Sequence, residues 1–123
     1  MAVRVIVCGS RGFCDEKLCF ETLDEVLKGL TDIEIVSGHA KGADMLGEAY
    51  GNEHGFKVSV FKADWKMYGR GAGPVRNRQM LEYALEEEAV VIGFWDGSSK
   101  GTKNMLDIAE KSGARVHTIC YTP

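Results

Sequence analysis

The amino-acid sequence predicts an α/β fold in three layers, with a five-stranded parallel sheet between two layers of helices. Two observations lead to this prediction. Short apolar runs rich in β-branched and aromatic residues alternate with segments of helical periodicity along the whole chain. The runs are apolar nearly throughout, which is typical of parallel strands buried on both faces. We therefore expect alternating strands and helices that form a single sheet.

Five segments have the composition of strands. Each is an uninterrupted, largely apolar run of a length that is usual for a strand. In chain order, the expected strands are Val3 to Cys8, Ile33 to Ser37, Lys57 to Phe61, Ala89 to Trp95 and Ala114 to Cys120.

Four helices are expected between these strands, because hydrophobic residues recur there with a period of three to four. Their apolar faces comprise Cys19, Leu23, Val26, Leu27 and Leu30; Ala43, Leu46 and Tyr50; Met80, Leu81, Ala84 and Leu85; and Met105, Ile108 and Ala109. Gly55 and Gly113 follow helical patterns, at the position where a left-handed residue ends a helix. Pro74 fits the first turn of the third helix.

The order of the strands follows from the handedness of their connections. Right-handed crossovers in a sheet of this size permit a Rossmann-like order, 3-2-1-4-5, or a flavodoxin-like order, 2-1-3-4-5. We expect the Rossmann-like order. In both arrangements, a ligand binds at the carboxyl ends of the strands.

Length and composition fit one folded domain over residues 1–123. The chain is 45% hydrophobic and 27% charged, which excludes intrinsic disorder. Its net charge of −3 argues against a duplex-DNA binder with a broad basic face. The longest N-terminal apolar stretch, Val5 to Cys8, is too short for a membrane span or signal segment, so we expect a cytoplasmic protein.

The cysteines do not form a metal-binding pattern. Cys14 and Cys19 are separated by four residues, but no second pair or matching histidines accompany them. We therefore expect thiols, no metal site and no required cofactor. Met80 and Met105 are expected to be core residues rather than ligand contacts.

Three glycine-rich loops follow strands and run directly into helices. They are Gly9-Ser10-Arg11-Gly12-Phe13, Gly38-His39-Ala40-Lys41-Gly42-Ala43-Asp44 and Asp96-Gly97-Ser98-Ser99-Lys100-Gly101-Thr102. Glycine allows backbone N–H groups to approach a ligand, and a helix N-terminus favours negative charge, so such loops suit a phosphate or carboxylate. A single loop of this kind is explained by turn geometry alone. Three at one edge of one sheet favour an anion site.

No standard nucleotide-binding motif is present. Gly9 and Gly12 lack the G-x-G-x-x-G spacing, and Gly97-x3-Gly101-Thr102-Lys103 lacks the spacing and residue order of a P-loop. The sequence therefore argues against an ATPase and against a conventional NAD dehydrogenase.

The longest connection, residues 62–78, carries five basic residues and one acid, a net charge of +4. It also holds Trp65, Tyr68 and three alternating glycines, Gly69, Gly71 and Gly73, which we expect in a loop. Aromatic faces, guanidinium groups and glycine amides together suit a base with phosphates. The simpler alternative to a ligand site is a solvated lid whose aromatic residues pack into the core.

Within this segment, Arg76 is the strongest candidate for an anion contact. Asp64 has three possible roles: pairing with Arg76, orienting it, or binding a ribose hydroxyl. Asp44 stands where an acid at a helix start favours the helix dipole.

Several segments together resemble a known family. They are Gly9-Ser10-Arg11; Gly38-x-Ala40-x-Gly42-Ala43-Asp44; Ala63-Asp64-Trp65 with Tyr68-Gly69; Ala72-Gly73-Pro74-x-Arg76-Asn77 with Met80; and Gly97-x3-Gly101-Thr102. In this order they resemble the small, single-domain YspA-like branch of the SLOG superfamily. Its relatives include the LOG-type phosphoribohydrolases and the Rossmann-like domain of DprA.

This resemblance implies a pocket for a nucleotide or nucleotide derivative, of the ADP-ribose or NAD type or a nucleoside phosphate, and a homodimer is plausible. LOG-type enzymes pair an arginine with a glutamate three residues after a G-T pair. Here Arg76 keeps the arginine, but Met105 occupies the position of the glutamate. Cleavage of a glycosidic bond requires a carboxylate near the anomeric carbon, which Asp44, Asp64 or Asp96 would have to supply.

We expect a sensor or sequestering protein for a nucleotide-derived small molecule. An N-glycosyl hydrolase or transferase, with Asp64 or Asp96 as the carboxylate and Arg76 as the phosphate clamp, is the first alternative. Single-stranded nucleic-acid binding along residues 62–78 is the second and less favoured one. The expected ligand-binding residues are Gly9, Ser10, Arg11, Gly38, Ala40, Gly42, Ala43, Asp44, Asp64, Trp65, Tyr68, Arg76, Asn77, Gly97, Lys100, Gly101 and Thr102.

Overall fold

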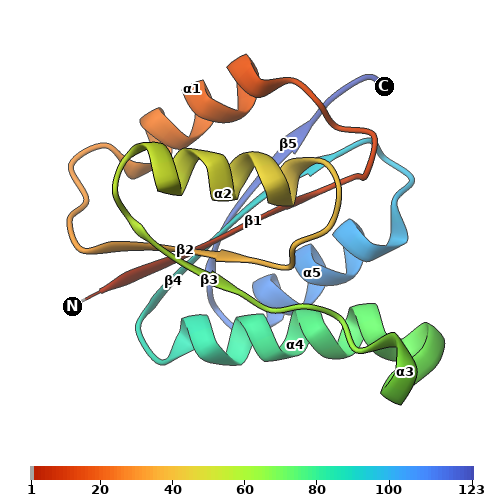
Figure 1. The fold of residues 1–123 in the computed structure, drawn as a ribbon. Helices are drawn as coiled ribbons and strands as arrows, with labels where there is room; N and C mark the ends of the chain where they lie inside the picture. Colours follow the sequence, from red (N-terminus) through yellow and green to blue (C-terminus); the bar gives the residue numbers. More distant parts are fainter. Residues whose placement is uncertain (1) are drawn as a thin grey trace.

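The computed structural model describes residues 2–123 and confirms the predicted α/β architecture (Figure 1). Its elements are β1 (Val3–Gly9), α1 (Glu16–Leu27), β2 (Ile33–Ser37), α2 (Ala43–Glu53), β3 (Lys57–Val60), α3 (Trp65–Tyr68), the 3-10 helix η1 (Gly69–Gly71), α4 (Ala72–Leu85), β4 (Glu88–Trp95), α5 (Lys100–Lys111) and β5 (Arg115–Cys120). The strand boundaries differ from the predicted ones by no more than one residue.

The five strands form one parallel sheet in the order β3-β2-β1-β4-β5, as predicted. β1 lies at the centre, where Val5 pairs with Ile35 of β2 and with Val90 of β4. Because all strands point the same way, their carboxyl ends share one edge. The crossovers to α2 and α5 begin at that edge, on either side of β1.

Helices cover both faces of the sheet, with α1 and α2 on one side and α4 and α5 on the other (Figure 1). Alternate residues of β1 enter the two cores: Val5 and Val7 belong to the first, and Ile6 and Cys8 to the second. All four are buried. This explains why the strand sequences are apolar without alternation.

Two glycines inside α2 are explained by close packing on the sheet. A Cβ atom on Gly47 would stand 2.7 Å from Cβ of Val7, and one on Gly51 would stand 2.8 Å from side-chain atoms of Ile35 and Val58. No other residue allows the helix backbone to approach the strands so closely. The approach holds the N-terminus of α2 against the end of β1.

The connection after β3 is more ordered than predicted. Residues 65–71 form the short elements α3 and η1, and Gly73 lies in the first turn of α4. The prediction of a loop through Gly69, Gly71 and Gly73 was therefore wrong, except that Gly69 caps α3 with a φ of 55°. Pro74 also lies in the first turn of α4, as predicted, because that turn has N–H groups without helical acceptors.

No helix within residues 2–123 has both the length and the hydropathy needed to cross a membrane.

Candidate functional site

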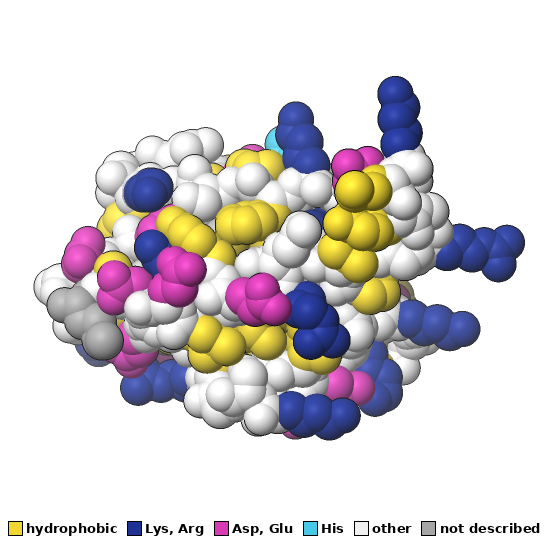
Figure 2. All heavy atoms as spheres, turned by 90° about the horizontal axis from the view of Figure 1, so that it is seen from below, with side chains coloured by type: hydrophobic (Ala, Val, Ile, Leu, Met, Phe, Trp, Pro, Cys, Tyr) yellow, Lys and Arg dark blue, Asp and Glu magenta, His cyan; other side chains and the backbone are white. Residues whose placement is uncertain are grey.

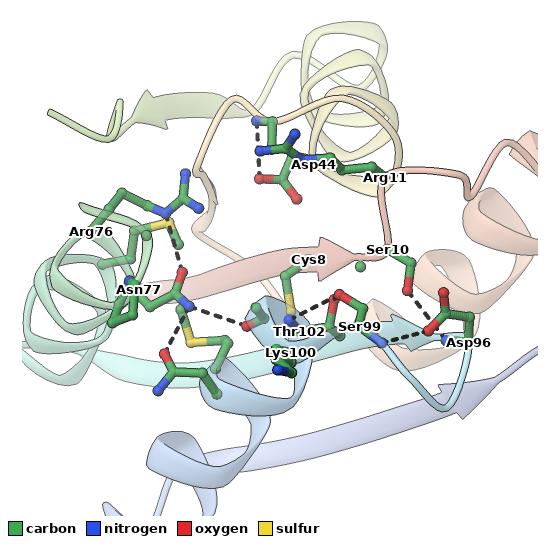
Figure 3. Close-up of a pocket in the computed structure, with 18 of the residues that line it drawn as sticks. Cys8, Ser10, Arg11, Asp44, Arg76, Asn77, Asp96, Ser99, Lys100 and Thr102 are labelled. Carbon is green, nitrogen blue, oxygen red and sulfur yellow. Dashed lines mark hydrogen bonds between the residues drawn. The ribbon is translucent and has the colours of Figure 1, made fainter. Parts of the chain in front are cut away.

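A cavity of about 600 Å³ opens at the carboxyl edge of the sheet (Figure 3). Its size lies within the usual range for small-molecule pockets, about 300–1,000 Å³. Four segments line it: the loop after β1, the start of α2, the segment from α3 into α4, and the start of α5. The predicted site residues that it brings together are Gly9, Ser10, Arg11, Ala40, Asp44, Trp65, Arg76, Asn77, Asp96, Lys100, Gly101 and Thr102.

The loop after β1 contains two residues of the cavity lining whose backbone amides have no partner in the described residues. Ser10 is buried, its N–H donates to the carbonyl of Phe94 at 3.1 Å, and its own carbonyl accepts from the N–H of Phe13 at 3.0 Å. This turn leaves the N–H groups of Arg11 and Gly12 without an acceptor anywhere in residues 2–123. Both residues line the cavity, so a bound anion would complete their hydrogen bonding.

The N-terminus of α5 forms a second group of amides. Ser99 caps the helix: its hydroxyl accepts from the N–H of Thr102 at 3.4 Å, and its carbonyl accepts from the N–H of Lys103 at 3.2 Å. In the described part of the chain, no acceptor reaches the N–H groups of Lys100 and Gly101. The helix dipole and the Lys100 ammonium add positive character here, so this end of α5 suits a phosphate.

Arg76 is held at the opposite wall of the cavity. Its Nη1 donates to the carbonyl of Gly38 at 2.6 Å, and its Nε donates to Oδ1 of Asn77 at 3.1 Å. Asn77, itself buried, donates through Nδ2 to Oδ1 of Asn104 at 3.0 Å and to the carbonyl of Gly101 at 3.3 Å. The arginine is thus tied to β2 and to α5, and its remaining N–H donors are available for a ligand.

Asp44 is an acid buried beside this arginine. It is 5% exposed, lines the cavity, and accepts through Oδ2 from the N–H of Ala40 at 3.2 Å. Burial raises its pKa to about 6, against the opposing effects of the Ala40 amide and the Arg76 guanidinium. Asp44 can therefore exchange a proton near neutral pH, which is the property required of an acid or base.

Asp96 shapes the loop after β4. Its Oδ1 accepts from the N–H of Ser98 at 2.9 Å and of Ser99 at 2.8 Å, and its N–H donates to the hydroxyl of Ser10 at 3.3 Å (Figure 3). These bonds from the Ser98 and Ser99 amides lower the pKa of the carboxyl, so it stays ionised. Asp96 lines the cavity while organising the loop around it.

Six predicted ligand residues do not line this cavity. Gly38 and Gly42 contact residues of the cavity lining. The carbonyl of Gly38 accepts a hydrogen bond from Arg76. Gly42 caps α2 with a φ of 98°, and a Cβ atom there would stand 2.6 Å from the Ser10 carbonyl oxygen. Ala43 is buried beside Gly9, and Gly97 turns the loop after Asp96. Tyr68 lines a separate groove.

Asp64 lies in the same separate groove, away from the main cavity. Its Oδ1 accepts from the N–H of Met67 at 3.1 Å and so caps α3. No ion pair joins Asp64 to Arg76 among the described residues, although both contact the groove. The role of pairing with Arg76 is therefore replaced by capping.

Sequence reasoning missed several residues of the cavity. Met80 and Met105 belong to the core as expected, yet they also form the cavity floor with Cys8. Burial raises the pKa of the Cys8 thiol far above its usual range, so it is no nucleophile there. Asn104 was also missed, although its place one turn after Lys100 on α5 was a usable signal.

The surrounding surface is basic. Figure 2 shows Lys and Arg side chains projecting mostly at the end of the molecule that carries α3, with Asp and Glu side chains mainly elsewhere on this face. Lys62, Lys66 and Arg70 are exposed residues of the segment around α3. No group of three His, Cys, Asp or Glu side chains within residues 2–123 is arranged to hold a metal ion.

Comparisons with known proteins bear on the family and the fold of the chain. A family model described as YspA, cpYpsA-related SLOG family matches residues 3–68. The Gene 61 protein of Mycobacterium phage D29 is 33% identical over 119 residues, which cover 92% of this chain and 93% of the phage protein. Among solved structures, DNA processing protein A (DprA) from Streptococcus pneumoniae is similar in fold, with a TM-score of 0.54 and 18% identity over 97% of this chain. The match covers only 59% of the DprA chain.

Proposed function

The chain belongs to the YspA, cpYpsA-related SLOG family, and from this premise we propose that it binds a nucleotide or a nucleotide-derived ligand. One observation carries the proposal. Arg11, Gly12, Lys100 and Gly101, whose N–H groups have no acceptor in the described residues, line one cavity together with Arg76. Backbone amides from two loops and a positioned guanidinium are the donors that phosphate groups prefer.

The base or ribose of the ligand would lie toward Trp65. This side chain lines the cavity and is 55% exposed, an unusual position for a large aromatic residue without a partner. Its ring offers a face on which a base can stack, and stacking of this kind contributes about 1–3 kcal/mol. The ligand class is therefore a nucleoside phosphate or a larger derivative such as ADP-ribose or NAD.

Binding is tested by thermal unfolding with nucleoside mono- and diphosphates, ADP-ribose and NAD. A ligand that binds only the folded chain stabilises it, by about 2.7 kcal/mol at a hundredfold excess over Kd. We expect a rise in Tm that grows with ligand concentration. In Arg76→Ala the affinity should fall about tenfold to a hundredfold, because a charge-assisted hydrogen bond contributes roughly 1.5–3 kcal/mol.

Arg78→Ala is the matched control, since Arg78 is an exposed arginine on the same helix that does not line the cavity. It should bind as the unmodified chain does. The absence of any shift in Tm at millimolar concentrations of every ligand would contradict the proposal.

A second candidate function is cleavage of the N-glycosidic bond of a nucleotide, and the position of Asp44 favours it. A buried carboxyl with a pKa of about 6 beside Arg76 can assist attack of water at the anomeric carbon. Asp96, which also lines the cavity, is occupied in its own loop. The test is release of free base, measured by chromatography. The activity should be lost in Asp44→Asn, and activity that persists in this variant removes Asp44 from the mechanism.

A further inference from the structure

A second, smaller cavity adjoins the first one. It is a groove of about 330 Å³ between the segment that contains α3 and the outer side of α4. Its lining includes Lys62, Asp64, Met67, Tyr68, Arg76 and Gln79. Within the described chain, Arg76 is the single residue that lines both the groove and the main cavity.

The short helix α3 contributes one aromatic side chain to each cavity. Trp65 lines the main cavity and Tyr68 lines the groove, and they are 55% and 41% exposed. Large aromatic side chains are seldom left so exposed without a partner to cover them. Arg76 is therefore shared by two cavities, each of which has its own exposed aromatic side chain.

The other side chains of the groove suit a sugar rather than another phosphate. Asp64 uses Oδ1 to cap α3 and leaves Oδ2 available as an acceptor, while Gln79 offers both an amide donor and an acceptor. Carboxylates and amides with an aromatic face match the hydroxyl groups and ring of a ribose or hexose. The Lys62 ammonium, which also lines the groove, can donate to a hydroxyl group, whereas the Asp64 carboxylate disfavours a second phosphate.

We propose that the ligand has two halves joined by a diphosphate: a nucleoside half in the main cavity, the phosphates near Arg76, and a sugar in the groove. This inference rests on the proposed function and narrows it to nucleoside diphosphate sugars and dinucleotides. Mononucleotides occupy the main cavity alone and bind more weakly.

The test compares ligands that differ only in the second sugar. Binding is measured by calorimetry for three pairs: ADP with ADP-ribose, UDP with UDP-glucose, and GDP with GDP-mannose. For one pair, the diphosphate sugar should bind at least tenfold more tightly than the diphosphate. Tyr68→Ala and Gln79→Ala should each remove most of this difference and leave the affinity for the diphosphate unchanged. Arg78→Ala, on the same helix outside the groove, should preserve it.

The outcomes separate this inference from the proposed function. Equal affinity for both members of every pair, or equal weakening of both by Tyr68→Ala, overturns the two-part ligand while nucleotide binding stands. Failure of all six ligands to bind overturns both. Tyr68 and Gln79 are exposed, so an unchanged Tm shows that each variant is folded.

Discussion

Two side chains of opposite charge approach the backbone of Gly38 at the end of β2. A Cβ atom there would stand 2.5 Å from Nη1 of Arg76 and 2.9 Å from Oδ2 of Asp44. A Cβ atom at this position would therefore force the ends of these two side chains to move. Any larger residue would displace the arginine that contacts both cavities.

Asp44 makes the stability of the protein depend on pH. Its pKa is about 6 in the folded state, above the ordinary value of 3.8, so the folded state holds its proton more tightly than the unfolded state does. Stability is therefore greatest below the unfolded pKa and declines as pH rises from about 4 to about 6. The decline is on the order of 3 kcal/mol for a shift of about two units.

We expect Asp44→Asn to be more stable than the unmodified chain at pH 7 and to lose this pH dependence. Urea unfolding between pH 4.5 and 7.5 measures it. The lowered pKa values of Glu34 and Asp96 act in the opposite direction, at the acidic end of this window and below it. Glu110→Gln, a substitution of an exposed carboxylate, is the control. If the free energy of unfolding changed with pH in the same way in Asp44→Asn and in the unmodified chain, the raised pKa of Asp44 would be contradicted.

At the scale of the elements, the close packing of α2 on the sheet requires that Gly47 has no side chain. At Gly47 an added methyl group would meet Cβ of Val7, an atom that cannot move without the strand. From the sequence alone, close packing is the one available explanation for Gly47 and Gly51, because helix propensity disfavours glycine. The distance between helix and strand is not encoded locally, so the sequence does not identify what they pack against.

Gly47→Ala should destabilise the protein by about 1–3 kcal/mol, because overpacking exceeds the gain in helix propensity. Gly101→Ala is the matched change in α5, where an added Cβ has nothing within 4 Å. It should stabilise the protein by roughly 0.5–1 kcal/mol. Chemical unfolding measures both variants. A Gly47→Ala variant that gains stability would show that α2 can move away from the sheet.

The four long helices and five strands were predictable from the sequence because each repeats an apolar period over enough residues to be recognised. The elements α3 and η1 were not, since four and three residues are too few to show a period. Their omission explains the main error at the site. The sequence predicted both Trp65 and Tyr68 as residues of one ligand pocket, whereas they line different cavities.

The candidate site was predictable at the level of its loops. Loops after β1 and β4 were expected to meet, because parallel order brings the carboxyl ends of neighbouring strands together. The tertiary contacts of single residues were not predictable. The bonds from Asn77 to Asn104 and Gly101 join α4 to α5 across 27 and 24 residues, and no local pattern encodes them.

For the molecule as a whole, charge is distributed unevenly, with a basic end around α3 in a chain of net charge −3. This end is small for a nucleic-acid interface. We expect a fluorescein-labelled 20-nucleotide single strand to bind with a Kd weaker than about 10 μM at 150 mM salt, in the range of non-specific binding. Fluorescence anisotropy measures it. A submicromolar Kd with a steep salt dependence would instead favour nucleic acid as the ligand.

The central position of β1 between β2 and β4 affects how the protein acquires its pocket during synthesis. The contact from Asp96 to Ser10 closes the cavity across 86 residues of sequence, and the amides of α5 follow Asp96. A growing chain therefore has no complete pocket until the segment through the start of α5 has left the ribosome and β4 has docked against β1. A ligand cannot guide the early steps of folding, and it stabilises only the finished sheet.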